Sequence, residues 1–358
     1  MRTYGVIMAG GGGTRFWPLS RQKRPKQLLN LSGNDLMVNE AIDRLAYVAD
    51  KKDIFVVTNA AQVPLILKAT KERLNPDHVL SEPMARNTAA CIGYAAMEIV
   101  KKYGDGVMVI TPSDHFIKDT AAFVRTLNTA VKAAEESDKL VTIGITPTFP
   151  STGFGYIKFD KLVQHDAKKV LEFREKPNEE TAKSYIQSGE YVWNSGMFIW
   201  KASVILKKYQ ELIPDIYVDL EKIGNAMKTD QEKSVIQEVY PDIRKISVDY
   251  AIMEPSAATG EVLVIPGEFG WNDVGSWDMM DVLHEADENG NVFVGDTVAV
   301  DVKDSVIYSS GKTVTAVGVE NLVIVETEDA IMVCPKDEAQ SVKKIVDILN
   351  ASDRKELL

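Results

Sequence analysis

Four consecutive glycines, Gly10–Gly13, follow directly after a short apolar run at residues 4–9. The apolar run has the length and composition of a buried strand. Glycine has no side chain to block close approach and tolerates most backbone angles, so the loop can turn its N–H groups toward one centre. A loop of this kind after a strand suits a bound anion. We therefore predict an anion-binding turn at the end of the first strand.

Basic residues follow the glycines closely, namely Arg15, Arg21, Lys23, Arg24 and Lys26. The whole chain carries a formal net charge of -11, so this local positive charge differs from the rest of the sequence. A glycine loop followed by several basic side chains predicts a binding site for a polyphosphate, because positive charge attracts the phosphate groups. The Walker pattern does not match, because no Gly-Lys-Ser/Thr follows these glycines and Val306 stands where Gly311-Lys312-Thr313 would need its leading glycine. The dinucleotide pattern does not match because Phe16 replaces its last glycine. A flexible surface turn is the alternative for the glycines alone.

The stretch from Met8 to Gln27 resembles the signature of the sugar-nucleotide pyrophosphorylases, and it reads MAGGGGTRFWPLSRQKRPKQ. Its segment Phe16–Pro18 is similar to that of the mannose-1-phosphate guanylyltransferases in particular. Further motifs follow in the order of that family, so the resemblance covers essentially the whole chain. It implies transfer of GMP from GTP to mannose 1-phosphate, which gives GDP-mannose and pyrophosphate, by magnesium-assisted in-line attack of the sugar phosphate on the α-phosphate.

Strand and helix patterns alternate through the first half of the chain, which predicts an α/β fold with a mixed, mostly parallel sheet. The resemblance implies that this part is a Rossmann-like nucleotidyltransferase domain. After residue 291 the pattern changes to short strands separated by turns, which predicts a small β-rich domain similar to a β-helix or a sandwich. A helix is expected at about residues 337–350. We predict a catalytic domain at residues 1–285 and a C-terminal domain at residues 286–358.

A second motif lies at residues 81–90. Pro83 ends the preceding strand, and Asn87 is a good N-cap for the helix that follows. Capping alone would explain Asn87, but the motif is also similar to the guanine-contacting segment of the resembled family. The resemblance therefore implies a nucleotide site formed by Gly10, Gly11, Gly12, Gly13, Thr14, Glu82, Pro83, Asn87 and Thr88.

Two aspartates, Asp114 and Asp273, are the candidate metal ligands. Asp114 follows a strand, and functional residues of open α/β sheets gather at the carboxyl ends of strands. Capping would equally explain Asp114, and a tight turn between glycines would explain Asp273. In the resembled family, aspartates in these two motifs hold Mg²⁺, which prefers hard oxygen ligands. The same resemblance implies two catalytic cations, Arg15 on the leaving pyrophosphate and Lys26 on the nucleotide phosphates.

Polar residues within an apolar strand mark a candidate sugar site. Asn194 and Ser195 interrupt the apolar run at residues 191–200, and buried polar groups need partners. A sugar hydroxyl or a neighbouring backbone group would supply the partner of Asn194. By resemblance, Glu175 accepts hydrogen bonds from sugar hydroxyls and Lys176 binds the sugar phosphate.

Two further segments have a family counterpart. Gly155 and Tyr156 are similar to an element that lines the sugar site, although a hairpin entry explains such glycines equally well. Residues 247–254 are similar to another family segment, and we expect only a structural role there, with Ser247 or Asp249 capping a helix.

Composition excludes several classes of protein. With 358 residues and 45% hydrophobic residues, the chain is typical of a globular protein with a large and a small domain. Its negative charge argues against nucleic-acid binding, and no apolar run approaches the roughly 20 residues of a membrane span. The N-terminus has no signal-peptide pattern, and Cys91 and Cys334 lie in apolar surroundings. We expect a cytoplasmic homodimer without a nucleic-acid or membrane partner.

Two alternatives remain open at this stage. One is a related transferase with another sugar or base, and the other is a non-catalytic nucleotide-binding regulatory protein on the same fold. The second would be favoured by a missing aspartate or arginine, but Asp114, Asp273 and Arg15 are all present. Some resembled enzymes continue into an isomerase domain, and we expect that activity to be absent because the sequence ends at Leu358.

Overall fold

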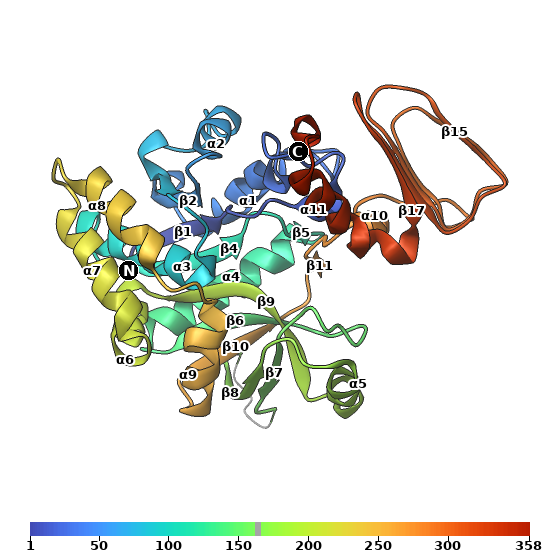
Figure 1. Cartoon of the computed structure of the whole chain (residues 1–358). Helices are drawn as coiled ribbons and strands as arrows, with labels where there is room; N and C mark the ends of the chain where they lie inside the picture. The colour runs from blue at the N-terminus through green and yellow to red at the C-terminus, as the bar shows by residue number, and fades with distance from the viewer. Residues whose placement is uncertain (162–165) are drawn as a thin grey trace. The chain divides into compact units, whose positions relative to one another are not determined.

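The computed structural model describes residues 1–161 and 166–358. These residues form two compact units that are interleaved along the chain. Unit 1 comprises residues 1–10, 41–112 and 117–271, and unit 2 comprises residues 11–40, 113–116 and 272–358. The domains predicted at 1–285 and 286–358 follow sequence order instead, and they stay a prediction. Figure 1 shows the elements of both units.

Unit 1 is built on a mixed sheet that has nine strands among the described residues. The strands are β1 Thr3–Met8, β2 Ile54–Asn59, β3 Val79–Glu82, β4 Val107–Pro112, β6 Leu140–Ile145, β7 Tyr156–Phe159, β8 Lys168–Arg174, β9 Tyr191–Lys201 and β10 Val262–Gly267. Their spatial order is β3-β2-β1-β4-β9-β6-β10-β8-β7. The pairs β3–β2, β2–β1, β1–β4 and β6–β10 are parallel, whereas β9 runs antiparallel to both of its neighbours β4 and β6. The predicted α/β fold with a mixed sheet is confirmed. Parallel pairs do not predominate as predicted, because β10–β8, β8–β7 and β7–β9 are antiparallel as well.

Helices connect and cover the strands of unit 1 (Figure 1). They are α2 Val63–Ala69, α3 Asn87–Lys102, α4 Thr120–Glu135, α5 Glu179–Ser188, α6 Ala202–Leu212, α7 Pro214–Ala226, α8 Glu232–Val239 and α9 Glu254–Ala258. Shorter 3₁₀ helices lie at Lys51–Asp53, Pro76–His78 and Tyr240–Asp242, and a π-helix at Asp249–Met253 precedes α9. Val248 is already helical, so Ser247 is the residue directly before this helical segment. The Ser247 carbonyl accepts from the Ala251 N–H (3.0 Å), and its Oγ accepts from the Tyr250 N–H (3.4 Å). Of the two predicted caps, Ser247 therefore makes the contacts of an N-cap, whereas Asp249 lies inside the helix.

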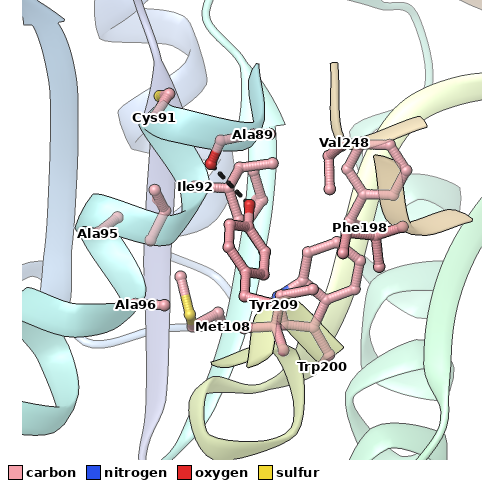
Figure 2. Packing of buried hydrophobic residues seen from close by; sticks show 14 of the residues in the cluster. Ala89, Cys91, Ile92, Ala95, Ala96, Met108, Phe198, Trp200, Tyr209 and Val248 are labelled. Carbon is pink, nitrogen blue, oxygen red and sulfur yellow. Dashed lines mark hydrogen bonds between the residues drawn. The ribbon is translucent and has the colours of Figure 1, made fainter. Parts of the chain in front are cut away.

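The core of unit 1 depends on close packing of α3. Most of this helix is buried, and small residues such as Ala89 and Gly93 let its neighbours approach. A Cβ added at Gly93 would overlap Leu220 of α7 and lie 2.7 Å from the Tyr209 ring of α6. Figure 2 shows the Tyr209 hydroxyl group, which donates a hydrogen bond of 2.6 Å to the Ala89 carbonyl. Buried Trp200 of β9 belongs to the same cluster.

Unit 2 contains a coil of short strands in its C-terminal part (Figure 1). The strands are β12 Val292–Val294, β13 Thr297–Val300, β14 Val306–Ser309, β15 Val314–Val317, β16 Leu322–Glu326 and β17 Ile331–Pro335. Strands β12, β14 and β16 pair in parallel, β13 and β15 also pair in parallel, and β17 runs antiparallel to β16. Alternate strands thus stack into two parallel sheets, and the predicted β-helix-like domain is confirmed.

Unit 2 also holds the short helices of the glycine-rich segment and of the C-terminal residues. The 3₁₀ helices are Thr14–Phe16, Lys26–Leu28, Trp277–Met279, Lys336–Val342 and Lys355–Leu357, and the α-helices are α10 Met280–Leu283 and α11 Lys343–Ala351. The helix predicted at residues 337–350 is therefore a 3₁₀ helix in its first half. Three elements cross between the units, namely α1 Met37–Leu45, β5 Phe116–Ile117 and β11 Trp271–Asn272.

The larger hydrophobic cluster of unit 2 joins its N-terminal segment to its C-terminal part. Phe16, Trp17 and Leu29 pack in it with Trp277 and with buried residues of the β-helix and α11. The Trp17 indole N–H donates to the carbonyl of Leu357 (2.9 Å), and the Trp277 indole N–H donates to the carbonyl of Trp17 (3.1 Å). The glycine-rich segment therefore folds together with the C-terminal part of the chain. Among the helices of both described ranges, none is long and apolar enough to cross a membrane.

Candidate active site

Lys26 joins the two predicted metal ligands in unit 2. Its side chain is only 6% exposed. The ammonium group donates to Oδ2 of Asp114 (2.8 Å) and to the backbone carbonyl of Asp273 (2.9 Å). The structure thus brings together three predicted catalytic residues that lie far apart in the sequence.

The charges around Lys26 shift the pKa values of both aspartates. Burial would raise the pKa of Asp114, but the Lys26 and His115 charges and the Lys26 hydrogen bond outweigh it, so this pKa is lowered. The pKa of Asp273 is raised by burial and by the charge of Asp114, although Lys26 and Arg15 oppose the increase. Asp114 is thus kept ionised, whereas the surroundings of Asp273 disfavour its charged form.

Position 13, the last of the loop, must be glycine because Lys26 packs directly against it. Gly13 has a φ of +62°, and an added Cβ would overlap the Lys26 side chain and lie 3.1 Å from the Lys26 backbone nitrogen. Both the backbone angle and the close approach therefore exclude other residues. At Gly11, by contrast, an added Cβ would meet no atom within 4 Å. Gly11 and Gly12 are exposed, so their backbone lies at the surface of unit 2.

Arg15 and Thr14 are exposed at the start of a 3₁₀ helix. The Arg15 charge acts on Asp273, which places this predicted catalytic cation near the aspartates. The neighbouring Phe16 is fully buried, and the Lys26 ammonium lies 5.5 Å from the centre of its ring. Phe16 therefore supports the site from the core of unit 2.

The Asp114 and Asp273 pair has the ligand chemistry of a hard cation. Among residues 1–161 and 166–358, no group of three or more His, Cys, Asp or Glu side chains is placed to hold a metal ion. Mg²⁺ is usually held by one or two protein carboxylates, and substrate phosphates and water complete its coordination. The pair therefore fits Mg²⁺ bound together with a phosphate substrate.

Glu82 is the most buried of the residues predicted to bind the nucleotide. It ends β3, is 4% exposed, and its Oε1 accepts a hydrogen bond from the Tyr240 hydroxyl group. A Cβ added at Gly10 would lie 3.3 Å from Oε2, so the first glycine of the loop lies beside the other carboxyl oxygen. Burial raises the pKa of Glu82 to about 7, and the Tyr240 hydrogen bond opposes this increase.

Asn87 is not the N-cap that the sequence predicts. The N-cap position of α3 is Arg86, and its side chain makes no capping hydrogen bond. Asn87 itself has a φ of +67°, and its Oδ1 accepts a hydrogen bond of 2.8 Å from the Thr88 N–H. Asparagine tolerates this left-handed conformation because its short side chain can bond locally. Pro83 precedes this turn and is half-buried.

Thr88 connects the predicted nucleotide segment to another part of unit 1. Its hydroxyl oxygen accepts a hydrogen bond of 2.9 Å from the Val248 N–H. The next residue, Asp249, accepts a hydrogen bond from Asn194 of the predicted sugar site. The two segments are thus held at a defined distance from each other.

Glu175 and Asn194 face each other beside Gly155. An added Cβ at Gly155 would overlap Oε2 of Glu175 and lie 3.2 Å from Cβ of Asn194. The Glu175 side chain is 7% exposed, and its Oε1 lies 2.9 Å from the Lys176 ammonium. Its Oε2 is buried and has no hydrogen-bond partner among the described residues. This oxygen is an available acceptor for a ligand hydroxyl.

Asp249 also belongs to this cluster, although we expected only a structural role for its segment. Oδ1 of Asp249 accepts a hydrogen bond of 2.8 Å from the Asn194 amide. Burial and the charge of Glu175 raise the pKa of Asp249 to about 7, and the Asn194 hydrogen bond opposes the shift. Asp249 also opens the π-helix, and π-helical turns are frequent at functional sites. The family-like segment at residues 247–254 was the signal that could have identified it.

The side chains of Tyr156 and Ser195 point away from this cluster. The Tyr156 hydroxyl group donates to the Ser151 carbonyl (2.9 Å), and the Ser195 hydroxyl group donates to the Ile143 carbonyl (2.8 Å). Successive side chains of a strand point to opposite faces, so only one of two neighbouring residues can face the cluster. Gly155 and Asn194 face it, and Tyr156 and Ser195 do not.

Comparisons with known proteins identify the family of this chain. Residues 4–290 match the model of the nucleotidyl transferase family, and residues 295–349 match a MannoseP isomerase/GMP-like beta-helix domain. Mannose-1-phosphate guanylyltransferase RfbM from Salmonella typhimurium is 41% identical, over 98% of this chain and 73% of the relative. Xanthan biosynthesis protein XanB from Xanthomonas campestris pv. campestris is 40% identical, over 98% of this chain and 74% of the relative. The solved structure of a mannose-1-phosphate geranyltransferase from Thermus thermophilus is 32% identical with a TM-score of 0.88, and the match covers 98% of this chain and 100% of that chain.

Proposed function

Because the chain belongs to the nucleotidyl transferase family, we propose that it transfers GMP from GTP to mannose 1-phosphate, giving GDP-mannose and pyrophosphate. The resemblance to mannose-1-phosphate guanylyltransferases is confirmed by relatives of that name that are 39–41% identical. The observation that carries the proposal is the contact of Lys26 with Asp114 and Asp273, because it joins a buried cation and two acidic residues beside the glycine loop.

The proposed reaction needs no nucleophile from the protein. A phosphate oxygen of mannose 1-phosphate, already ionised at neutral pH, forms a bond to the α-phosphorus of GTP. The bond from that phosphorus to the oxygen that bridges to the β-phosphate breaks, and its electron pair leaves with pyrophosphate. Much of the barrier is repulsion between the two anions, so the protein must supply positive charge and positioning.

Three basic side chains supply this charge in our proposal. Lys26 binds the nucleotide phosphates, Arg15 stabilises the leaving pyrophosphate, and Lys176 binds the sugar phosphate. Lys26 is buried and fixed by hydrogen bonds, which supports a positioning task. Arg15 is exposed and the Lys176 side chain is 56% exposed, so both are accessible to a substrate.

Mg²⁺ held by Asp114 and Asp273 is part of the proposal. When bound, this ion would neutralise phosphate charge and orient the reacting groups. Lys26 offsets part of the negative charge of the two carboxylates. No third carboxylate is required, because Mg²⁺ is usually held by one or two protein carboxylates together with substrate phosphates and water. A cytoplasmic location and a homodimer stay predictions, and we propose no nucleic-acid or membrane partner.

The remaining predicted residues are assigned to substrate recognition. We propose that the glycine loop with Thr14 binds the GTP phosphates and that Glu82, Pro83, Asn87 and Thr88 bind guanine. Glu175 and Asn194 are assigned to the sugar hydroxyls, with Gly155 providing the space beside them. For Tyr156 and Ser195 we propose a supporting role through the hydrogen bonds of their side chains to the backbone.

A pyrophosphate-release assay tests the proposal by crossing GTP, ATP, UTP and dTTP with several sugar 1-phosphates in the presence of Mg²⁺. We expect the highest kcat/KM for GTP with mannose 1-phosphate. A clear preference for another pair would identify a related transferase with a different base or sugar. Binding of GTP without pyrophosphate release from any pair would instead indicate a non-catalytic nucleotide-binding protein.

A further inference from the structure

The contact between Tyr240 and Glu82 has no role in the reaction as proposed above. We infer that Tyr240 is a positioning residue, whose hydroxyl group keeps the Glu82 carboxylate ionised and turned so that its second oxygen remains available to the N–H donors of guanine. This inference rests on the proposed function, and it adds a residue that determines the preference for guanine.

The geometry gives the two carboxyl oxygens different tasks. Tyr240 lies in the 3₁₀ helix after α8, is fully buried, and donates to Oε1 of Glu82. The backbone of Glu82 is fixed by β2 and by a hydrogen bond of 2.8 Å from the Ala60 N–H to its carbonyl. Oε2 lies on the side of Gly10 and accepts no hydrogen bond from the residues that the structure describes. One oxygen is therefore held by the protein and the other is left for a ligand.

Base chemistry explains why ionisation of Glu82 matters. The Watson–Crick edge of guanine presents two donors, N1–H and the N2 amino group, whereas adenine presents an acceptor at N1. An ionised carboxylate only accepts hydrogen bonds, but a protonated carboxyl group also donates one. A site built to pair with donors discriminates strongly against a base that lacks them, because its buried acceptor would be left unpaired. Discrimination for guanine therefore requires the ionised form of Glu82.

Within the described part of the chain, no positive charge acts on Glu82 to keep it ionised. The titratable groups packed around it are Tyr240 and, from α3, Cys91 and Tyr94, and burial raises the pKa of each of these three groups. All three are neutral near pH 7. The pKa of Glu82 is set to about 7 by burial, which raises it, and by the Tyr240 hydrogen bond, which lowers it. Removing the Tyr240 hydroxyl group would thus leave Glu82 mostly protonated at neutral pH.

The test compares Tyr240→Phe with the matched control Tyr94→Phe. Tyr94 is 4% exposed, and its ring packs against the Tyr240 ring with centroids 5.8 Å apart. Among the described residues, its hydroxyl group makes no hydrogen bond to Glu82. Both substitutions delete one tyrosine hydroxyl group from the same pair of packed rings. Only Tyr240→Phe removes the hydrogen bond to the Glu82 carboxylate.

The measurement is kcat/KM for GTP between about pH 5.5 and 9, with Mg²⁺ and saturating mannose 1-phosphate. For the wild type we expect kcat/KM to rise with pH through the Glu82 pKa of about 7. Tyr240→Phe should move this rise upward by about one pH unit and lower kcat/KM at pH 7 by about fivefold, mainly through KM. Its preference for GTP over ATP should fall as well. Tyr94→Phe should keep the wild-type pH profile.

Three results would overturn the inference. They are an unchanged pH profile in Tyr240→Phe, an equal shift in both tyrosine variants, and a shift that persists when Tyr240→Phe is made in a Glu82→Gln background. If the wild type releases no pyrophosphate, the proposed function fails. The inference is then still tested by calorimetry of GTP binding over the same pH range, because nucleotide affinity should show the same shift.

Discussion

At the scale of single residues, Lys26 differs from the other cations of its segment by its burial. Arg15, Lys23 and Arg24 are exposed, whereas Lys26 is enclosed and donates to Asp114 and Asp273. A buried charge is costly unless it is paired, and here the Asp114 carboxylate pairs with the ammonium group while the Asp273 backbone carbonyl accepts a second hydrogen bond. Lys26 therefore connects the charge balance of the site to its geometry.

Replacing Lys26 by methionine tests this connection. We expect Lys26→Met to lower kcat/KM by about 10²–10³-fold, because a preorganised positive charge is lost from the reacting phosphates. Pyrophosphate release measures the loss. Lys23→Met is the matched control, since Lys23 is an exposed cation of the same segment, and it should keep near wild-type activity. Comparable activity of the two variants would remove Lys26 from the mechanism.

Asp273→Ala tests the metal site. With Mg²⁺ present, we expect this variant to lose most of its turnover, because one of the two carboxylates is missing. Turnover should be measured as a function of Mg²⁺ concentration. Asp281→Ala, at an exposed aspartate of α10, should behave as the wild type. Near-normal turnover of Asp273→Ala would reject the assignment of Asp273 as a metal ligand.

Asp249 makes the stability of unit 1 depend on pH. Its pKa is raised to about 7, so the folded chain binds a proton more tightly than the unfolded chain. This contribution is complete only below the ordinary Asp pKa of 3.8, and it is lost progressively as the pH rises from there through about 7. Asp249→Asn removes the titration, so at about pH 8 it should be more stable than the wild type by on the order of 1–3 kcal/mol, and at about pH 4 the difference should be small. Thermal unfolding at both pH values measures the effect. A stability difference between Asp249→Asn and the wild type that is the same at both pH values would contradict it.

At the scale of elements, the glycine loop has two distinct parts. Gly13 is required by its left-handed backbone and by the Lys26 side chain packed against it. Gly11 has no such neighbour, so the need for glycine there would come only from a ligand. The four glycines look equivalent in the sequence, but their physical reasons differ.

Alanine substitutions separate these two reasons. Gly13→Ala should destabilise the protein by about 1–2 kcal/mol from its backbone conformation alone, and it should displace Lys26. Gly11→Ala should leave the stability unchanged but weaken GTP binding, because a methyl group would then lie where phosphate approaches the backbone. Thermal unfolding and GTP titration measure the two effects. Equal behaviour of the two variants in both measurements would contradict the division of the loop.

At the scale of the whole molecule, the chain is not divided in sequence order. The glycine-rich segment shares a hydrophobic core with residues of the β-helix and α11, and Trp17 bonds to the carbonyl of Leu357. The nucleotidyl transferase match at residues 4–290 therefore does not contain all of the core that holds Lys26. The β-helix supports the proposed active site although it supplies none of the proposed catalytic residues.

Removing residues 291–358 tests this dependence. The shortened chain keeps every residue of the proposed site, but Phe16, Trp17 and Trp277 would lose most of their packing partners. We expect it to aggregate or to release no pyrophosphate. Residues 291–358 supplied as a separate chain should restore part of the activity. A shortened chain with full activity would show that the shared core is dispensable.

Much of this structure was predictable because its patterns are local. The alternation of strand and helix patterns indicated the α/β fold, the short strands after residue 291 indicated the β-rich domain, and the family-like motifs contained Asp114, Asp273 and Glu175. Local errors arose where tertiary contacts override propensity. Asparagine is a favoured N-cap residue, but the turn after Pro83 places Asn87 in a left-handed conformation inside the first turn of α3.

The sequence by itself determined the elements and the residue types of the candidate site, since periodicity, glycine runs and buried polar groups act over a few neighbouring residues. Only the tertiary structure decided which cation is buried, that Asp249 joins Asn194, and that Tyr240 holds Glu82. These contacts join residues far apart in the chain. They depend on how helices and strands pack, and no local pattern records that packing.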